Sequence, residues 1–168
     1  SVAGPAKIFV ENDLILDGQS EILCSEDVEI YVKGDIRLGN HSTIAGEGNN
    51  KLYTQGSLEF GNGVVLFPGD SSAELLVGGN IVGTNNVVMF PDADAWNLVF
   101  VLGNVTMDNN AHVGNESLPN TVFYMPNNES YFALRNNGSV FGGIYLPYGV
   151  IEFKNNAVVD GSLVCKTL

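Results

Sequence analysis

The sequence predicts an all-β fold: a right-handed parallel β-helix, or solenoid, of about seven coils with three short strands per coil. Three observations support it. A motif of glycine, a small polar residue, an apolar–x–apolar triplet and asparagine recurs through most of the 168 residues, and its asparagine position steps by 22, 22, 23, 24, 27 and 19. Periods in this range are typical of solenoids. The intervening runs are rich in strand-forming residues, and no segment combines a helical period with helix caps.

Each coil is expected to open with a strand such as Val28–Val32, to turn at a Gly/Asn corner, and to continue into a short strand such as Val105–Met107. An asparagine turn and a third apolar run such as Val64–Phe67 complete the coil. Gly and Asn suit these corners because they adopt positive φ at little cost. The chain should form one domain over residues 1–168, with coils at about 7–27, 28–49, 50–72, 73–95, 96–119, 120–142 and 143–168.

The asparagine position has a structural explanation. Its column comprises Gly18, Asn40, Asn62, Asn85, Asn109, Asn136 and Asn155. Stacked coils would place these amides about 4.8 Å apart, so that each NH₂ donates to the next carbonyl in an asparagine ladder. We expect this ladder to hold the coils together and not to form a ligand site.

Composition excludes several partners. The net charge of -12 repels nucleic acid and anionic lipid, and no run of about 18 apolar residues is present to span a membrane. The chain starts at Ser1 without an initiator methionine or signal peptide, as expected for a mature or excised domain. Cys24 and Cys165 fall in the first and last coils, roughly 29 Å apart at the strand spacing, so we expect them to stay reduced.

The C-terminal part of the sequence carries a resemblance to a known class. The runs Phe141–Pro147, Val150–Asn156 and Asp160–Val164 resemble the closing coils of bacterial surface β-solenoid modules of the pilus-associated (minor-pilin-like) or wall-anchored type, although Leu146 stands where alanine is usual. The ice-binding β-solenoids are a looser resemblance. The first resemblance implies a non-enzymatic extracellular module for structure or adhesion, whose partner is a protein subunit or a cell-surface glycan, and it supplies no catalytic residues.

Two other functions remain open. A β-helix can be a carbohydrate-binding or carbohydrate-active protein, but the sequence contains no recognisable nucleophile–base pair, phosphate loop or His/Cys metal spacing. We therefore do not expect an enzyme. An ice-binding protein needs a flat face of threonines, whereas Thr43, Thr54, Thr84, Thr106 and Thr121 fall in different columns.

Acidic residues gather in the loops that close the coils. Glu47, Asp70, Asp92 and Asp94 lie in neighbouring loops that should stack on one edge, where converging carboxylates would suit Ca²⁺. Solvated acidic loops are the simpler interpretation. Trp96, the single tryptophan, closes this edge and is expected either to cover the core or to stack on a sugar.

The opening strands predict an apolar outer surface. One column reads Lys7, Glu29, Lys51, Glu74 and Leu98, with charges of alternating sign, and two residues further on the same face carries Phe9, Tyr31, Tyr53, Leu76 and Phe100. Parallel strands that are apolar on both faces are normally covered on both. We expect either that a segment of this chain or a flanking helix covers this stripe, or that it docks a partner subunit or sugar rings.

Overall fold

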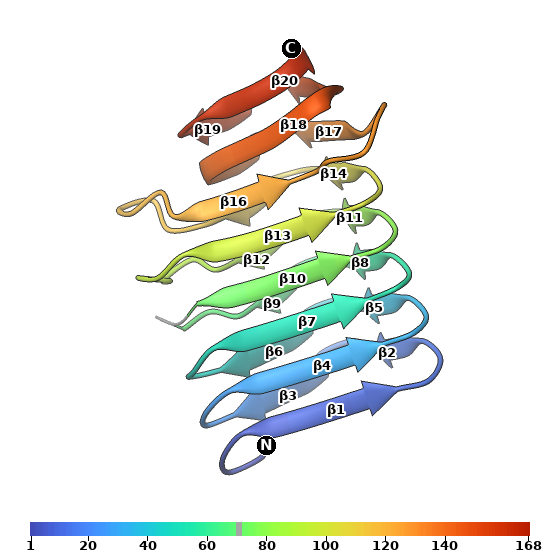
Figure 1. The fold of residues 1–168 in the computed structure, drawn as a ribbon. Coiled ribbons are helices and arrows are strands. Elements are labelled where there is room, and N and C mark those ends of the chain that lie inside the picture. Colours follow the sequence, from blue (N-terminus) through green and yellow to red (C-terminus); the bar gives the residue numbers. More distant parts are fainter. Residues whose placement is uncertain (70–71) are drawn as a thin grey trace.

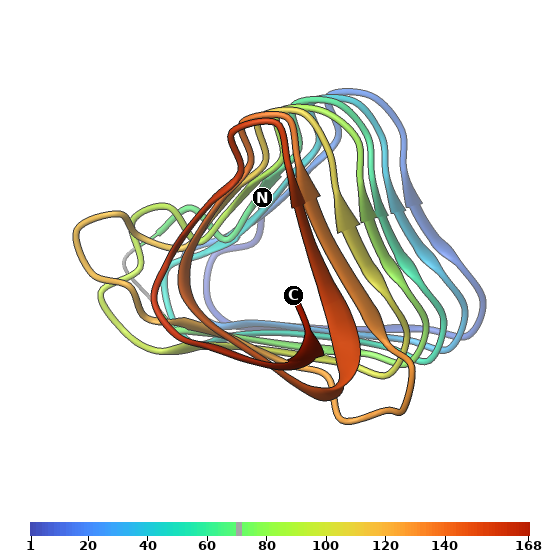
Figure 2. The same cartoon turned by 90° about the horizontal axis from the view of Figure 1, so that it is seen from above.

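A computed structural model describes residues 1–69 and 72–168, and all regular structure in these residues is β. The chain winds as a right-handed solenoid of about seven turns with a triangular cross-section (Figures 1 and 2). This confirms the predicted fold class. The described residues contain no helix, and so none that is long and apolar enough to cross a membrane.

Three parallel sheets form the sides of the triangle. The first face consists of β1 (Ala6–Val10), β4 (Val28–Val32), β7 (Asn50–Thr54), β10 (Ala73–Val77), β13 (Asn97–Val101), β16 (Thr121–Tyr124) and β20 (Leu163–Thr167). The second consists of β2 (Leu14–Leu16), β5 (Ile36–Leu38), β8 (Leu58–Phe60), β11 (Ile81–Gly83), β14 (Val105–Met107) and β17 (Tyr131–Arg135). The third consists of β3 (Glu21–Cys24), β6 (Thr43–Gly46), β9 (Val65–Leu66), β12 (Val88–Met89), β15 (His112–Val113) and β19 (Val158–Asp160).

The long strand β18 (Ser139–Lys154) contributes to all three faces. It pairs with β15 and β19 near Ser139, with β16 and β20 near Ile144, and with β17 near Ile151. It therefore bends around two corners of the triangle. Strand β20 then adds one further strand to the first face, on top of β18.

The core follows from the alternation along each strand. On the first face Ile30, Leu52, Leu75 and Val99 point inward and are fully buried, as the sequence predicts. The register is unbroken here, because each of these residues pairs with its equivalent in the next coil. The solenoid is thus held by an apolar interior that continues from coil to coil.

The asparagine ladder is present, but it is double. One column links Asn85, Asn109, Asn136 and Asn155 by amide hydrogen bonds of 2.5–2.8 Å. A second column, one residue further along each turn, contains Asn86, Asn110, Asn137 and Asn156 and is linked at 3.1–3.3 Å. Asn86 also donates to Asn62, because the second column has Gly63 in that coil.

Positive φ angles are concentrated in these turns. All four residues of the second column have φ between 51° and 63°, whereas Asn62 and Asn85 of the first column do not have positive φ. The positive φ expected at the asparagine turns is therefore found at Asn109, Asn136 and Asn155 and throughout the second column, but not at Asn62 or Asn85. The ladder bonds lie at an exposed corner, so they are weaker than bonds in the interior.

The two cysteines are free, in agreement with the prediction. Cys24 is buried at the end of β3, and burial raises the pKa of its thiol. Cys165 is half-buried in β20. The thiols therefore act as small apolar groups at the two ends of the core.

Candidate functional site: the outer surface of the first face

The strand register extends the predicted apolar stripe along the whole first face. Each member pairs with the next in adjacent coils. We call this column the aromatic stripe; it comprises Phe9, Tyr31, Tyr53, Leu76, Phe100, Tyr124, Tyr145 and Val164. The prediction that the rings point outward is confirmed: Phe9 is 68% exposed and Tyr31, Tyr53 and Phe100 are half-buried, while the residues that alternate with them in β4, β7 and β13 are buried.

Sequence reasoning missed the last three members, Tyr124, Tyr145 and Val164. Tyr124 follows Phe100 by 24 residues, the same step as from Leu76 to Phe100, so the period does align it. The steps to Tyr145 and Val164 fall to 21 and 19 residues, so a fixed period does not align these two. The alternation in Thr121–Tyr124 carries a local signal, because Thr121 and Phe123 point inward and are fully buried while Tyr124 is exposed.

The rings of the stripe stack face to face. Tyr31 lies 5.1 Å from Phe9 and 4.8 Å from Tyr53, centroid to centroid, with interplanar angles of 12° and 14°. Beyond Leu76 the stacking resumes, with Tyr124 at 5.6 Å from Phe100 and 5.3 Å from Tyr145. The strand spacing imposes this order, since equivalent residues are about 4.8 Å apart. The ring faces are thus turned toward one another, and the ring edges are turned toward solvent.

The charged column beside the stripe pairs across coils, as predicted. Lys7 Nζ lies 2.8 Å from Glu29 Oε2, and Lys51 Nζ lies 4.0 Å from Glu74 Oε2. Lys7 also lies over the ring of Tyr31, 5.1 Å from its centroid, in a cation–π contact. The two phenols join the columns: Tyr31 donates to Glu29 at 2.8 Å and Tyr53 to Glu74 at 3.0 Å.

These contacts fix the charge state of the surface. The hydrogen bond from Lys7 holds the pKa of Glu29 below its usual range, and Tyr31 adds to this effect. The same bond raises the pKa of Lys7. Burial and the Glu74 carboxylate raise the pKa of Tyr53 to about 12. The ion pair and the neutral phenol are therefore both stable at neutral pH.

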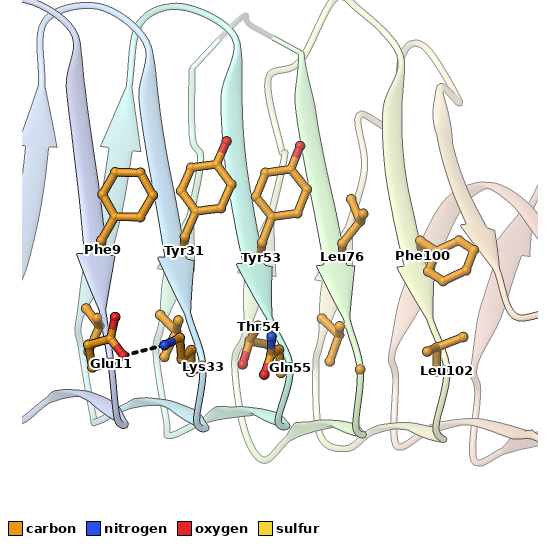
Figure 3. A pocket seen from close by; sticks show the side chains of 14 residues that line it. Phe9, Glu11, Tyr31, Lys33, Tyr53, Thr54, Gln55, Leu76, Phe100 and Leu102 are labelled. Atoms are coloured by element: carbon orange, nitrogen blue, oxygen red, sulfur yellow. Dashed lines mark hydrogen bonds and ion pairs between the residues drawn. The ribbon is translucent and has the colours of Figure 1, made fainter.

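A groove of about 430 Å³ runs beside the stripe (Figure 3). One wall is the stripe from Phe9 to Phe100, and the other is the corner row that follows it. That row comprises Glu11, Lys33, Gln55, Gly78 and Leu102. Glu11 and Lys33 form an ion pair, whereas Gly78 contributes no side chain. The groove is mainly apolar, with charge at one end.

Residues 126–130 project from the corner where the groove ends (Figure 2). Asn127 Nδ2 donates to the carbonyl of Leu102 at 2.7 Å, which ties this loop to the last residue of the corner row. No segment of residues 1–69 or 72–168 covers the stripe, so the expectation that a segment of this chain covers it finds no support in the described part.

The acidic loops lie at a different corner of the triangle, where the third face meets the first. Glu47, Asp92 and Asp94 are all exposed there, and Asp70 lies outside the described residues. Among residues 1–69 and 72–168 no three acidic, histidine or cysteine side chains come close enough to hold a metal. Since Asp70 belongs to the predicted set, the calcium site stays a prediction.

Trp96 does not cover the core, because it is 71% exposed. It borders a second hollow, of about 490 Å³, on the other side of the charged column from the groove. The lining of this hollow is largely polar: Asp27, Glu29, Asn49, Asn50, Lys51, Ser72, Ala73, Glu74, Trp96 and Leu98. The first face thus carries an apolar groove and a polar hollow, separated by the charged column.

Arg37 Nε lies 3.3 Å from Glu59 Oε2 on the second face, a cross-coil ion pair. Thr43 lies on the third face, Thr54 is buried on the first and Thr106 lies on the second. These threonines therefore do not line one face. This agrees with their placement in different columns of the sequence.

Comparison with known proteins gives one match. The family described as "Domain of unknown function (DUF7305)" matches residues 52–168, which include most of the stripe and Trp96. Neither the curated proteins nor the solved structures compared with this chain include a match. This chain forms a parallel β-solenoid. Because the match spans well over half of the sequence, the chain belongs to the DUF7305 family.

Proposed function

We propose that this chain is a non-enzymatic structural and adhesion module of the cell surface, of the pilus-associated or wall-anchored kind, and that its aromatic stripe binds a partner protein subunit. One observation carries the proposal: eight outer residues in register, six of them aromatic, form an apolar column along the whole first face that no segment of the described residues covers. Contiguous apolar surface of this kind marks an interaction site in a soluble protein.

The orientation of the rings favours a protein over a glycan at the stripe. A sugar ring stacks on the open face of an aromatic ring. In the stripe, Tyr31 stacks on Phe9 on one side and on Tyr53 on the other, so neither of its faces is open. The exposed ring edges and the adjoining groove instead suit the apolar side chains of a protein segment, which bind as knobs in pockets.

The scaffold suits a structural role. Seven coils at the strand spacing give a rod about 34 Å long. Each coil is bonded to the next through three parallel sheets, and the double asparagine ladder adds bonds between the coils from Asn85 onward. A partner that contacts several coils therefore meets a surface whose shape is already set, which limits the conformational entropy lost on binding.

Site-specific photo-crosslinking in the cells that make the protein tests the proposal. A benzoyl-phenylalanine at position 100, within the groove, should yield a discrete adduct with one protein. The same probe at position 82, where Val82 is 39% exposed on the second face, should yield none. The double substitution Tyr31→Ser and Tyr53→Ser should abolish the adduct while leaving the thermal unfolding cooperative. Equal adducts at both positions, or none at position 100, would contradict the proposal.

Location and ligand class need separate controls. On intact cells a membrane-impermeant biotin reagent should label the chain, whereas exclusion of the reagent would contradict a surface location. On a glycan array the stripe should not contribute to glycan binding. Glycan binding that is lost in the Tyr31→Ser, Tyr53→Ser variant would replace the protein partner by a carbohydrate.

A further inference from the structure

The loop that carries Trp96 is anchored by buried amides. Asn120, 3% exposed, donates its Nδ2 to the carbonyl of Ala93 at 2.8 Å and also to that of Ala95. Asn115 adds a 3.2 Å bond to Ala93, which is fully buried. Asn97, the residue after Trp96, is 1% exposed, and its Oδ1 accepts from the backbone N–H of Ala73 at 3.0 Å. The backbone on both sides of Trp96 is therefore held to the core.

The indole of Trp96 is 71% exposed on an anchored loop, and it differs from the rings of the stripe in its stacking. No aromatic ring of the described residues stacks on it, so its face is open to a ligand. Exposing tryptophan is unfavourable by itself, since the hydrophobic effect favours its burial. A flexible loop could fold such a side chain back onto the surface, but the anchored backbone holds this one at the rim of the hollow.

The hollow next to Trp96 offers hydrogen-bonding groups without a large net charge. Asp27 Oδ1 accepts from the backbone N–H of Asn49 at 2.7 Å, and Asn49 Oδ1 accepts from Ser72 at 2.6 Å. The carboxylates of Glu29 and Glu74 are paired with Lys7 and Lys51. With Asp27 included, three carboxylates face two ammonium groups, which leaves one net negative charge.

We propose that Trp96 and this polar hollow form a binding subsite for a neutral saccharide, separate from the aromatic stripe. A pyranose ring would stack on the indole, and its hydroxyls would bond to Asp27, Asn49 and Ser72, which line the hollow. Hydroxyl groups match this set because they both donate and accept. An anionic sugar would meet the net negative charge of the hollow and of the chain as a whole, so it is disfavoured.

The single tryptophan supplies its own reporter, because all indole fluorescence arises from Trp96. Titrating the protein with three neutral oligosaccharides, maltohexaose, cellohexaose and chitohexaose (N-acetylated), should give with one of them a saturable change in intensity and a blue shift. Polygalacturonate should give neither. Asp27→Asn should weaken binding about tenfold, a loss expected for one well-placed hydrogen bond to a charged group.

Two further variants separate this subsite from the stripe and from misfolding. In Trp96→Ala, calorimetry should show at least about tenfold weaker binding of the same sugar, with an unchanged melting temperature, because the removed side chain is exposed. Phe100→Ser changes a stripe residue that lines the groove but not the hollow, so it should leave saccharide affinity unchanged, and failure of the docking proposal would not affect this one. Absence of a saturable response to all three sugars up to about 10 mM would overturn the inference. A response to an Arg-rich peptide alone would do so too, and would assign the hollow to a cation.

Discussion

The phenol of Tyr53 donates a 3.0 Å hydrogen bond to Oε2 of Glu74, one coil further along the solenoid. This bond connects the aromatic stripe with the charged column and separates the apolar groove from the polar hollow. Tyr31 bonds to Glu29 of its own strand instead. The Tyr53–Glu74 contact is thus a cross-coil link. It leaves the phenol of Tyr53 partly buried and hydrogen-bonded to a carboxylate.

The first prediction concerns the titration of Tyr53. Burial and the Glu74 carboxylate both disfavour the phenolate and raise the pKa of Tyr53 to about 12, from an ordinary value of 10.0. Because the folded pKa is the higher one, the bond contributes its full stability below pH 10 and loses it as the pH rises from 10 to 12. Absorbance at 295 nm should show that Tyr53→Phe removes one phenol that titrates near pH 12. Glu74→Gln should lower that pKa only part of the way, since burial is the larger cause.

A simple result would contradict this prediction. If the difference between the titration curves of the wild type and Tyr53→Phe were a group ionising near pH 10, the Tyr53–Glu74 bond would not be formed in solution. Tyr148→Phe is the matched control, because Tyr148 is 57% exposed and lies outside the stripe. This substitution should leave the phenol that titrates near pH 12 in place.

The second prediction concerns the buried amide of Asn120. Asn120→Ala removes the donor to the Ala93 and Ala95 carbonyls and an acceptor for Asn97, and it leaves buried polar groups without partners. Each such group costs roughly 1–3 kcal/mol. Urea denaturation should therefore show a loss of about 2–4 kcal/mol in unfolding free energy. The fluorescence anisotropy of Trp96 should fall as its loop is released.

Asn128→Ala provides the comparison for Asn120→Ala. Asn128 is exposed in the loop of the same coil, so its substitution should change the unfolding free energy by less than about 0.5 kcal/mol. Equal effects of the two substitutions, or an unchanged anisotropy in Asn120→Ala, would show that Asn120 does not hold the Trp96 loop.

The third prediction separates hydrogen bonding from backbone conformation in the asparagine ladder. Asn110 has φ of 60°, donates to Asn86 at 3.1 Å and accepts from Asn137 at 3.3 Å. Asn110→Gly removes the amide but keeps the conformation favourable, and should destabilise by about 0.5–1 kcal/mol. Asn110→Ala also places a Cβ in the left-handed region, which adds about 1–2 kcal/mol. Thermal unfolding should rank the wild type, Gly and Ala in that order of decreasing stability. A variant pair with equal melting temperatures would show that backbone conformation contributes nothing here.

The period of the sequence was sufficient to predict the solenoid, because one residue type recurs at each corner and apolar residues alternate along each strand. The same alternation predicted which way Tyr31 and Tyr53 point. Where the coil length changes, between Tyr124 and Val164, the period no longer aligns equivalent residues. Only the hydrogen-bonded register then shows that the stripe continues.

The two hollows of the first face were beyond sequence reasoning for a different reason. The groove depends on how the chain turns at the corner after the stripe, and on Gly78 leaving space there. The exposure of Trp96 depends on Asn120, which lies one coil away and bonds to the carbonyls of Ala93 and Ala95. Such contacts between a side chain and a distant backbone leave no periodic signal. The second asparagine column did leave one, in the Asn–Asn pairs at 85–86, 109–110, 136–137 and 155–156.

The fourth prediction concerns acid stability at the C-terminal end of the second face. Glu152 accepts a hydrogen bond from the phenol of Tyr131, pairs with Lys154, and lies 3.5 Å from Arg135 Nη2. The bond from Lys154 is the largest cause that lowers the pKa of Glu152 to about 2, from an ordinary 4.5, and the bond from Tyr131 comes next. Because the folded pKa is the lower one, the stabilisation is present above pH 4.5 and disappears as the pH falls from 4.5 toward 2. Glu152→Gln keeps the shape and removes the charge, so its melting temperature should lie below that of the wild type at pH 6, and the difference should shrink through this window. Glu116→Gln, at an exposed carboxylate, should show no such change. If the difference in melting temperature between Glu152→Gln and the wild type stayed constant from pH 6 to pH 2, the Glu152 carboxylate would not be ion-paired in solution.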